Sequence, residues 1–527
     1  MQTHLHLAAS LAATFLLVPI RNICSTVALK TFGATACLIL ASRAAYSLWI
    51  YPNYVSPLRH LPGPKNHHFL FRQFINEFRS RDPNEPFLSW TKKWPDAEMI
   101  RYFPFGAVEA ILVTGVTPLR EIVSINGYSF VKPQSLKTLL EPMVGTGLVF
   151  SEGAEHKAAR HLLSGPFALS KLRELIPVFQ HKAQQLLASF DRQIEKQGGV
   201  VELVSTYSNL MLDIIGAAAL GVELKNLEVP TPFFELYEEM NNPPPLGKLF
   251  MAINAFIPVA WIPLDVIKRL NNASQEVRRL LRAIIQQRVQ DVTEKGVGGL
   301  GRRDLLTYMV EETHATENTL SEEEILGHIL NFIAGGHDTS ASSLTWATYA
   351  MIKYPVVQDR LRAEITTMLD QTPVPGYSEL EDLKYLDSFC KEVLRVWAPA
   401  TSSPREAAHD ILINGVLVPK GTLINLMPAA IHFNPRVWGD DAEEFNPDRW
   451  SRKSIDPHAF VTFFRGPRQC IGRVYSMIQF KVLLVQMVSK FRFEAIETET
   501  EKKMELLTYP THLLRPVELE VRVGRLG

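Results

Sequence analysis

The chain has 527 residues, of which 46% are hydrophobic and 21% charged, ordinary proportions for a folded globular protein. Lys and Arg together number 55, as do Asp and Glu, so the formal net charge is zero. This balance argues against a protein that binds nucleic acid through a basic excess, and against a highly charged disordered chain. The four cysteines show neither a disulfide framework nor a CxxC zinc pairing, which indicates a reducing compartment.

The N-terminal segment is far less charged than the rest of the chain. Leu5–Ile20 is an uncharged run of 16 residues, and Thr31–Ile50 is a run of 20 residues interrupted only by Arg43. A helix needs about 20 apolar residues to span a bilayer, so the second run is long enough if Arg43 reaches a headgroup layer. The first run could be a second span or an interfacial helix. We expect residues 1–58 to form a membrane anchor, with a signal peptide or a buried core helix as alternatives.

A rigid elbow follows the anchor at Leu61-Pro62-Gly63-Pro64, because two prolines around a glycine prevent a helix from crossing this point. We expect residues 59–66 to be a proline-rich hinge and residues 67–527 to be one catalytic domain. Met99–Phe103 and Ala110–Val113 are predicted to be β-strands.

The remainder of the body is predicted to be mainly α-helical, from about residue 117 to about residue 397. Strands return at Ile411–Ile413 and Val416–Val418, which flank the hairpin signal Asn414-Gly415. Val517–Val523 alternates apolar and polar residues and predicts a further strand. The fold class is therefore mainly α with a minor β portion towards both ends.

One long helix is predicted between Ser321, which begins a capping box with Glu324, and Tyr354, which precedes a proline. Its length of about 50 Å and its apolar surface place it at the centre of the protein. The stretch Gly335–Ser340 interrupts this pattern, because each glycine costs about 1 kcal/mol in a helix and a buried aspartate must be paired. A kink or a close helix crossing would explain the glycines. A widened groove, where a ligand meets a hydroxyl and an acid, would also explain Asp338 and Thr339.

Cys470 lies in a loop that opens into the predicted helix Val474–Val488. The helix dipole and its free N–H groups favour a thiolate, Arg468 adds positive charge, and the two loop glycines let the backbone approach the sulfur. An inert buried thiol is the alternative. A nucleophilic cysteine would need a histidine base, and no motif supports one. A single thiolate ligand to a metal fits the loop better.

The loop resembles the FxxGxRxCxG haem-binding loop of the cytochrome P-450 family, whose fixed positions are filled by Phe463, Gly466, Arg468, Cys470 and Gly472. Further segments resemble family motifs in the right order. These are the proline-rich hinge, the [AG]Gx[DE]T[TS] oxygen-activation stretch, the ExxR helix motif and the FxPxRF segment, at residues 61–64, 335–340, 392–395 and 445–450. Trp450 stands where the last motif has Phe, and the resemblance covers about residues 60–527.

The resemblance implies the cytochrome P-450 fold and a haem b (iron protoporphyrin IX) with Cys470 as axial thiolate. Thr339 would then hold a water by a hydrogen bond, and Asp338 would support proton delivery. A buried structural triad is expected, tolerated only if its charges are mutually hydrogen-bonded, from Glu392, Arg395 and Arg449. Three residues would hold the haem propionates: Arg405, together with His156 and Arg160, which align with the family's WxxxR pair.

Membrane-anchored members of the family imply a monooxygenase that inserts one oxygen atom from O₂ into a hydrophobic small molecule. The sequence style resembles fungal secondary-metabolism members, so a terpenoid, polyketide, alkaloid or lipid-like substrate is expected. Because 57 residues follow Cys470, we expect no room for an electron-transfer domain. NADPH-cytochrome P-450 reductase, with cytochrome b5 as a second donor, would supply electrons at the endoplasmic reticulum membrane, on its cytosolic side.

Two other functions stay open on the sequence alone. A haem-thiolate isomerase or dehydratase would need no reductase, but the intact Asp338-Thr339 pair counts against it, because such enzymes need not activate O₂. A non-catalytic haem carrier or sensor is the other alternative.

Overall fold

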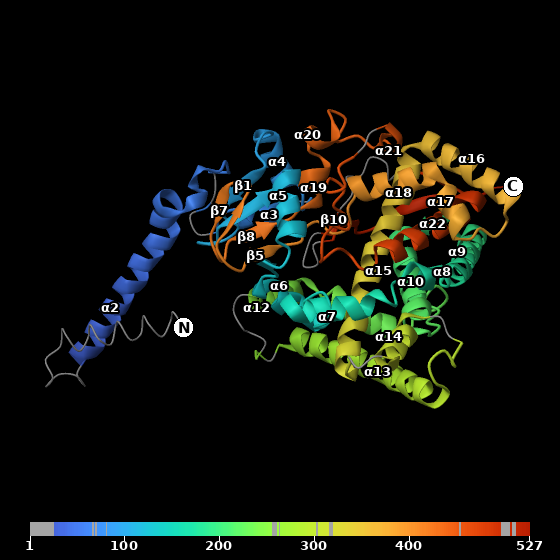
Figure 1. Cartoon of the computed structure of the whole chain (residues 1–527), viewed down its shortest axis with the longest axis horizontal. Coiled ribbons are helices and arrows are strands. Elements are labelled where there is room, and N and C mark those ends of the chain that lie inside the picture. The colour runs from blue at the N-terminus through green and yellow to red at the C-terminus, as the bar shows by residue number, and fades with distance from the viewer. Residues whose placement is uncertain are drawn as a thin grey trace.

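The computed structural model describes residues 26–526 apart from gaps at 66–67, 69–70, 81, 256–260, 263, 302–303, 316–319, 453–454, 497–505 and 508–512. The predicted apolar run Leu5–Ile20 lies outside these residues. The second run forms α2 (Thr26–Ala45) and continues into the π-helix η2 (Tyr46–Val55). Lys30–Val55 is long and apolar enough to cross a membrane, and it projects away from the body of the protein (Figure 1).

The end of this projecting segment is bonded to the body through backbone carbonyls. Pro52 lies inside η2 and has no N–H to donate back along the helix. The Leu48 carbonyl, one helical turn earlier, accepts a hydrogen bond from Arg72 Nη2 at 2.7 Å, and the Pro52 carbonyl accepts one from Arg101 Nη2 at 2.7 Å. Arg101 is itself held by an ion pair with Glu109. Two body arginines therefore bond carbonyls of η2 close to Pro52 and tie the helix to the body.

The elbow packs against the first strand of the body. The helical turn η3 (Pro57–His60) ends before it, which confirms that no helix crosses Leu61–Pro64. Arg101 N donates to the Pro62 carbonyl at 2.8 Å, and any Cβ on Gly63 would collide with the Arg101 carbonyl. Glycine is therefore required at this close approach of two backbones.

A five-stranded sheet joins segments from distant parts of the chain. Its order is β1 (Met99–Tyr102), β2 (Ala110–Val113), β8 (Leu423–Asn425), β5 (Arg405–Ala407) and β3 (Phe130–Val131). The β2–β8 pair is parallel and the other three pairs are antiparallel. The two strands predicted near residue 100 are confirmed, the first ending at Tyr102.

The predicted hairpin is confirmed as β6 (Ile411–Ile413) and β7 (Val416–Val418), with positive φ at both turn residues, 48° at Asn414 and 74° at Gly415. The C-terminal strand was predicted too early. β12 (Glu520–Arg525) begins three residues after Val517 and pairs with β4 (Val200–Glu202) and β9 (Phe491–Glu494). Val521 and Val523 fill the core side of β12, whereas Val517 is exposed, because it lies in the turn that precedes the strand.

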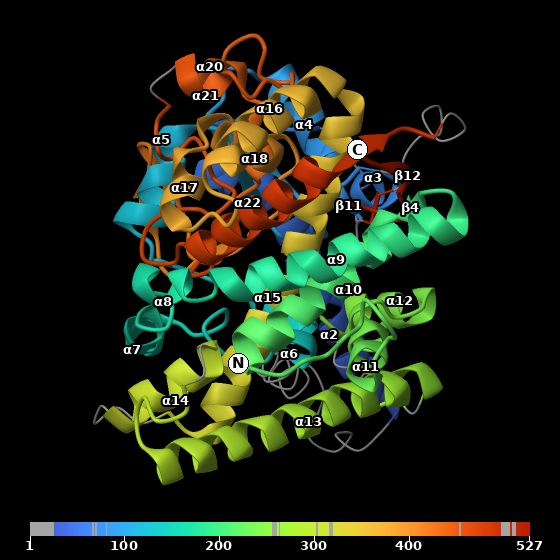
Figure 2. The same cartoon turned by 90° about the vertical axis from the view of Figure 1, so that its right-hand side faces the viewer.

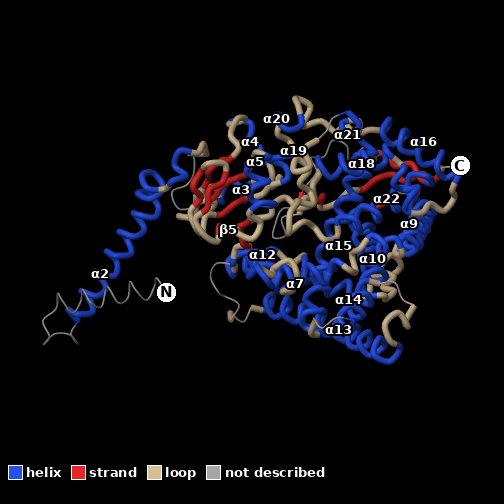
Figure 3. Tube along the Cα trace, viewed as in Figure 1, coloured by secondary structure: helices blue, strands red, loops and turns tan. Residues whose placement is uncertain are grey.

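Helices make up most of the body, as predicted, and Figure 3 shows most of the strands in two groups on either side of it. Before the long central helix they are α3 (Phe74–Arg79), α4 (Glu85–Lys93), α5 (Val116–Arg120), η4 (Glu121–Ile125), α6 (Gln134–Val144), α7 (Gly153–Ser164), α8 (Leu169–Arg173), α9 (Ile176–Gln197), α10 (Leu203–Ile215), η5 (Gly216–Leu220), α11 (Pro232–Asn241), α12 (Pro245–Asn254), α13 (Asp265–Lys295) and α14 (Leu305–Ala315).

After the central helix, α15 (Glu322–Lys353), come α16 (Pro355–Gln371), α17 (Tyr377–Asp382), α18 (Lys384–Val396), α19 (Pro428–His432), α20 (Pro435–Trp438), α21 (Arg449–Arg452) and α22 (Arg473–Lys490). A small hairpin is formed by β10 (Leu506–Leu507) and β11 (Arg515–Pro516).

The predicted central helix is confirmed in its ends and its place. Ser321 and Glu324 form the reciprocal capping box, and Tyr354 caps the other end. α15 packs against α6, α10, α13, α18 and α22. In Figure 2, α9 runs across the view between α13 and α14 on one side and α18 and α22 on the other. Leu203–Leu220 is also apolar and long enough for a membrane span, but 83% of it is buried, so it belongs to the core.

Candidate functional site

The two glycines of α15 face different surroundings. A Cβ on Gly336 would lie 2.6 Å from Ile215 Cδ1 of α10, so this glycine permits a close helix crossing. A Cβ on Gly335 would meet nothing within 4 Å, and Gly335 is exposed in the middle of an otherwise buried helix. The close helix crossing expected from the sequence is therefore present at Gly336, while Gly335 faces open space, and the α-helix continues unbroken through the stretch.

We predict opposite effects for two substitutions at neighbouring positions. Gly335→Ala should raise stability by up to about 1 kcal/mol, because alanine is the better helix former and the added methyl meets open space. Gly336→Ala should lower it by about 1–3 kcal/mol, because the methyl overpacks the contact with Ile215. Thermal unfolding of the two variants against the parent checks this, and equal effects at the two positions would contradict the assigned surroundings.

Thr339 and Asp338 lie on the same stretch, each with one bond already made. Thr339 Oγ1 donates to the Gly335 carbonyl at 2.6 Å, so its hydrogen is used and its lone pairs remain to accept a hydrogen bond. Asp338 Oδ1 lies 3.2 Å from Arg515 Nη1 of β11, which meets the requirement that the buried acid be paired. Arg515 was not predicted from the sequence, since it lies far along the chain from the motif.

The cysteine loop closes on itself and then begins a helix. Cys470 N donates to the Phe463 carbonyl at 3.0 Å, and α22 starts at Arg473 with Gly472 as its cap. Gly466 has a φ of 80°, and a Cβ there would collide with the Val123 carbonyl, so its role is a close approach to η4 rather than to the sulfur. Gly472 is the glycine beside the thiol, because its Cβ position lies 3.9 Å from Cys470 Sγ.

The pKa of Cys470 differs from the prediction that the helix start and Arg468 favour a thiolate. Burial raises the pKa of the Cys470 thiol, against the opposing effects of the Gly472 backbone, Arg160 and Arg473. Arg468 does not act on the sulfur as predicted, because its guanidinium turns to Glu152 and to the Ser151 carbonyl. The side chain is nevertheless open to solvent. Protein atoms thus surround the sulfur while solvent still reaches it, an arrangement that we call the recess, and a bound cation would be needed there to deprotonate the thiol.

Positively charged side chains gather beside the loop from several elements. Arg160 of α7 donates to the Gln469 carbonyl at 2.7 Å, and Arg405 of β5 donates to Ser403 Oγ at 3.0 Å. Arg468 forms an ion pair with Glu152. Lys132, which follows β3, completes this group and was missed from the sequence because a lone lysine after a strand carries no signal.

Because these positive charges lie close together, the pKa values of two of them are lowered. Burial, reinforced by Arg405 and Arg468, lowers the pKa of Lys132 to about 7. Burial and Arg468 lower the pKa of Arg405 to about 10. A ligand that brings negative charge would offset the repulsion between these cations. The single thiol and this cationic cluster are thus compatible with the haem expected from the sequence, whose iron would need a ligand and whose two carboxylates would need cations.

His156 is buried next to the same cluster. Its Nδ1 lies 3.1 Å from the Tyr128 hydroxyl, and burial followed by repulsion from Arg468 lowers its pKa to about 4. The ring is therefore neutral near pH 7. When Tyr128 donates to Nδ1, the proton sits on Nε2, so His156 can still donate one hydrogen bond to a carboxylate.

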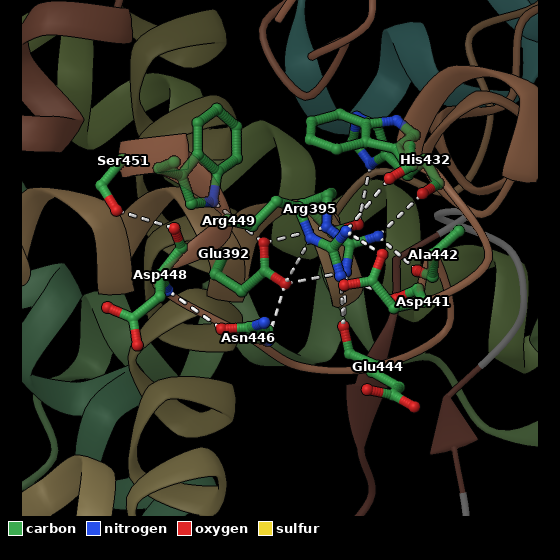
Figure 4. A network of polar contacts seen from close by, with 12 residues as sticks. Glu392, Arg395, His432, Asp441, Ala442, Glu444, Asn446, Asp448, Arg449 and Ser451 are labelled. Carbon is green, nitrogen blue, oxygen red and sulfur yellow. Dashed lines mark hydrogen bonds and ion pairs between the residues drawn. The ribbon is translucent and has the colours of Figure 1, made fainter. Parts of the chain in front are cut away.

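The predicted Glu-Arg-Arg set forms one buried network (Figure 4). Arg395 Nε and Nη2 donate to the two Glu392 oxygens at 2.9 and 2.8 Å, and Arg449 Nε lies 3.4 Å from Glu392 Oε1. The remaining Arg395 donors reach the carbonyls of His432, Ala442 and Glu444 at 2.6–2.8 Å. The charges are thus mutually bonded, as their burial requires.

Trp450, the departure from the family pattern, has its own place in this network. Its indole N–H donates to Glu392 Oε2 at 2.9 Å, a bond that phenylalanine could not make. His432 then links the network to the cysteine loop. Its Nδ1 bonds the Arg395 carbonyl at 2.8 Å, and its Nε2 accepts from Val461 N at 3.0 Å.

We predict that His432 makes the protein sensitive to acid. Burial and Arg395 lower the pKa of this fully buried ring to about 3, well below the usual 6.5. Its contribution to stability is therefore complete above pH 6.5 and is lost as the pH falls towards 3, reaching a loss of about 2 kcal/mol at pH 5. The stability difference between the parent and His432→Gln should shrink by that amount between pH 7.5 and pH 5 in denaturant titrations. A difference that stays constant over this range would contradict the prediction.

Comparison with known proteins gives a consistent picture. The model of the family described as Cytochrome P450 matches residues 62–522. Cytochrome P450 monooxygenase sphH of Aspergillus fumigatus is 29% identical over 488 residues, covering 88% of each chain. Cytochrome P450 monooxygenase FUM15 of Gibberella moniliformis is 28% identical over 526 residues, covering 88% of this chain and 87% of its own. Human cytochrome P450 3A5 is 28% identical over 418 residues, covering 76% of this chain and 80% of its own.

Proposed function

The chain belongs to the cytochrome P450 family, and from this premise we propose that it inserts one oxygen atom from O₂ into a hydrophobic small molecule. Its fungal relatives are named cytochrome P450 monooxygenases, and the chain is an oxidoreductase of this monooxygenase type. Family membership implies a haem-thiolate cofactor. The observation that carries the proposal is the recess holding a single thiol beside a cationic cluster.

We propose that Cys470 would hold the iron of a haem b through its sulfur, and that the cationic cluster would hold the propionates. When bound, the haem supplies the activation of O₂, which an electron-rich thiolate promotes. Arg160 and Arg405 place positive charge for the carboxylates, and His156 adds one neutral donor. Arg468 holds Glu152 and the carbonyl of Ser151, so it shapes the rim of the site as well as its charge.

Thr339 and Asp338 are proposed to hold a water and to transfer protons at the open side of α15. Because Thr339 Oγ1 already donates to Gly335, it can receive a hydrogen bond from a water in the groove. Asp338 can take a proton and pass it on, while Arg515 holds its carboxylate in place. An isomerase or dehydratase would have no need for this pair, which favours the monooxygenase.

The substrate is proposed to be apolar, of the terpenoid, polyketide, alkaloid or lipid-like class found in fungal secondary metabolism. The relatives in fungi support this class. We further propose that residues 1–58 anchor the protein in the endoplasmic reticulum membrane, with residues 59–66 as the hinge and 67–527 as the catalytic domain on the cytosolic side. NADPH-cytochrome P450 reductase, assisted by cytochrome b5, is the proposed electron source.

Microsomes that contain the full chain and a reductase test this function. They would be fed a hydrophobic fungal metabolite extract with NADPH under ¹⁸O₂, and the products analysed by mass spectrometry. We expect products two mass units heavier than those made under ¹⁶O₂, and none when NADPH is omitted. Products that form without NADPH and carry no label would instead show an isomerase or dehydratase. Spectral binding of the extract without turnover under any condition would favour a carrier or sensor.

A further inference from the structure

His337, in the middle of α15, is fully buried and held in one tautomer. Its Nε2 lies 3.0 Å from the Ser208 carbonyl and 2.9 Å from the Ser208 hydroxyl, both on α10. A carbonyl oxygen can only accept a hydrogen bond, so Nε2 must carry the hydrogen. In a neutral ring, Nδ1 would then present a bare lone pair.

This Nδ1 atom is buried and has no hydrogen-bond partner among the residues that the structure describes. It faces the carboxylate of the next residue, with Asp338 Oδ1 at 3.6 Å. A lone pair and a carboxylate facing each other in a buried place repel, whereas a proton on Nδ1 turns the contact into an ion pair. The geometry therefore calls for one proton between these two atoms.

Charged and polar groups from other elements surround the pair. Arg515 Nη1 lies 3.2 Å from Asp338 Oδ1, so a permanent cation also contacts this carboxylate. From α11, Tyr237 packs its ring edge-on at 5.3 Å from the His337 ring, and its hydroxyl is buried. Glu238 is half-buried on the same helix, and burial raises the pKa of its carboxyl, with His337 and Asp338 as further influences. Glu238 is thus a partly exposed carboxyl whose charge acts on both members of the pair.

We propose that His337 is a positioning residue that stores a proton for Asp338, a role that rests on the monooxygenase function proposed above. The Nδ1–H bond of His337 breaks as an O–H bond forms on Asp338, and this O–H bond then breaks as Asp338 passes the proton to a water beside Thr339. The imidazolium becomes neutral in the first step and Asp338 returns to a carboxylate in the second, so charge and atoms balance. Glu238 returns a proton to His337 from solvent. The step needs no oxidant or reductant.

The first test reads the proton directly in the full chain labelled with ¹⁵N-histidine. At pH 7.5 we expect one histidine resonance pair with both ring nitrogens protonated, which is absent in His337→Gln. In Asp338→Asn the same histidine should show an unprotonated Nδ1, because the carboxylate that holds the proton is gone. A wild-type spectrum in which the His337 Nδ1 is unprotonated would overturn the proposal, whether or not the protein oxidises any substrate.

The second test uses NADPH consumption by the full chain with a reductase in H₂O and D₂O. His337→Gln keeps a donor for the Ser208 carbonyl but cannot store a proton, so we expect a rate about 10- to 100-fold lower with a larger solvent isotope effect. His328→Gln is the matched control, the same substitution at a buried histidine on the same helix, bonded instead to Leu148 N at 3.1 Å. It should leave rate and isotope effect unchanged even if stability falls. Equal behaviour of the two variants would overturn the proposal.

Discussion

Cys470→Ala is expected to abolish the red-shifted Soret band that the reduced carbon monoxide complex of a haem-thiolate protein shows. The substitution removes the single thiol at the bottom of the recess. The cationic cluster remains, so the variant should still take up haem through the carboxylates, with another or no axial ligand. Difference spectra of the reduced microsomes check this, and monooxygenase turnover should be lost together with the band.

Two other cysteines provide controls for the loss of a thiol. Cys390 is fully buried on α18, where burial raises the pKa of its thiol far above the usual range, and Cys37 is exposed on α2. Cys37→Ala should leave the band at full intensity. Cys390→Ala should leave the wavelength of the band unchanged and lower the stability of the protein by a modest amount, because packing is lost. A red-shifted band that survives Cys470→Ala would refute thiolate ligation by this residue.

Glu392→Gln is expected to cost about 3–5 kcal/mol of stability, because it leaves Arg395 and Arg449 as buried charges without their shared carboxylate. This is a large part of the 5–15 kcal/mol that stabilises a typical folded domain. The variant should therefore accumulate at a low level and lose haem on mild heating. Thermal unfolding and holoprotein yield measure the effect.

Glu444→Gln is the matched control, since it makes the same chemical change in the same network. Glu444 contributes its carbonyl to Arg395, while its side chain is exposed, so this variant should differ from the parent by less than about 0.5 kcal/mol. Trp450→Phe should fall between the two, at about 1–3 kcal/mol, for the bond to Glu392. Equal stability of the two Gln variants would show that the Glu392 charge is not needed by the network.

Local patterns predicted those elements whose conformation depends on neighbours in sequence. The capping box at Ser321 and the Asn414-Gly415 turn were found where expected, because each is satisfied by bonds within a few residues. β12 was placed too early, since alternation alone does not say which residues meet β4 and β9.

In the candidate site too, local features could be predicted from the sequence and contacts between distant segments could not. The cysteine loop could be identified from its own residues, but the charges around it come from distant segments. Lys132 and Arg515 reach the site only through the sheet and the C-terminal hairpin, and neither has a local signal. Arg468 was placed correctly in the loop, yet its charge is directed to Glu152, 316 residues away in sequence, which no pattern within the loop could reveal.

The carbonyl bonds from Arg72 and Arg101 to η2 have a consequence for how the protein searches for its partners. Without such bonds, the body would rotate freely relative to its anchor, and each encounter with a partner would cost the entropy of aligning the two proteins. Here the rotation is removed once, during folding. A protein anchored by this segment would diffuse in the plane of a bilayer with its body in one fixed orientation. Another membrane-bound protein that collides with it would therefore always contact the same face of the body.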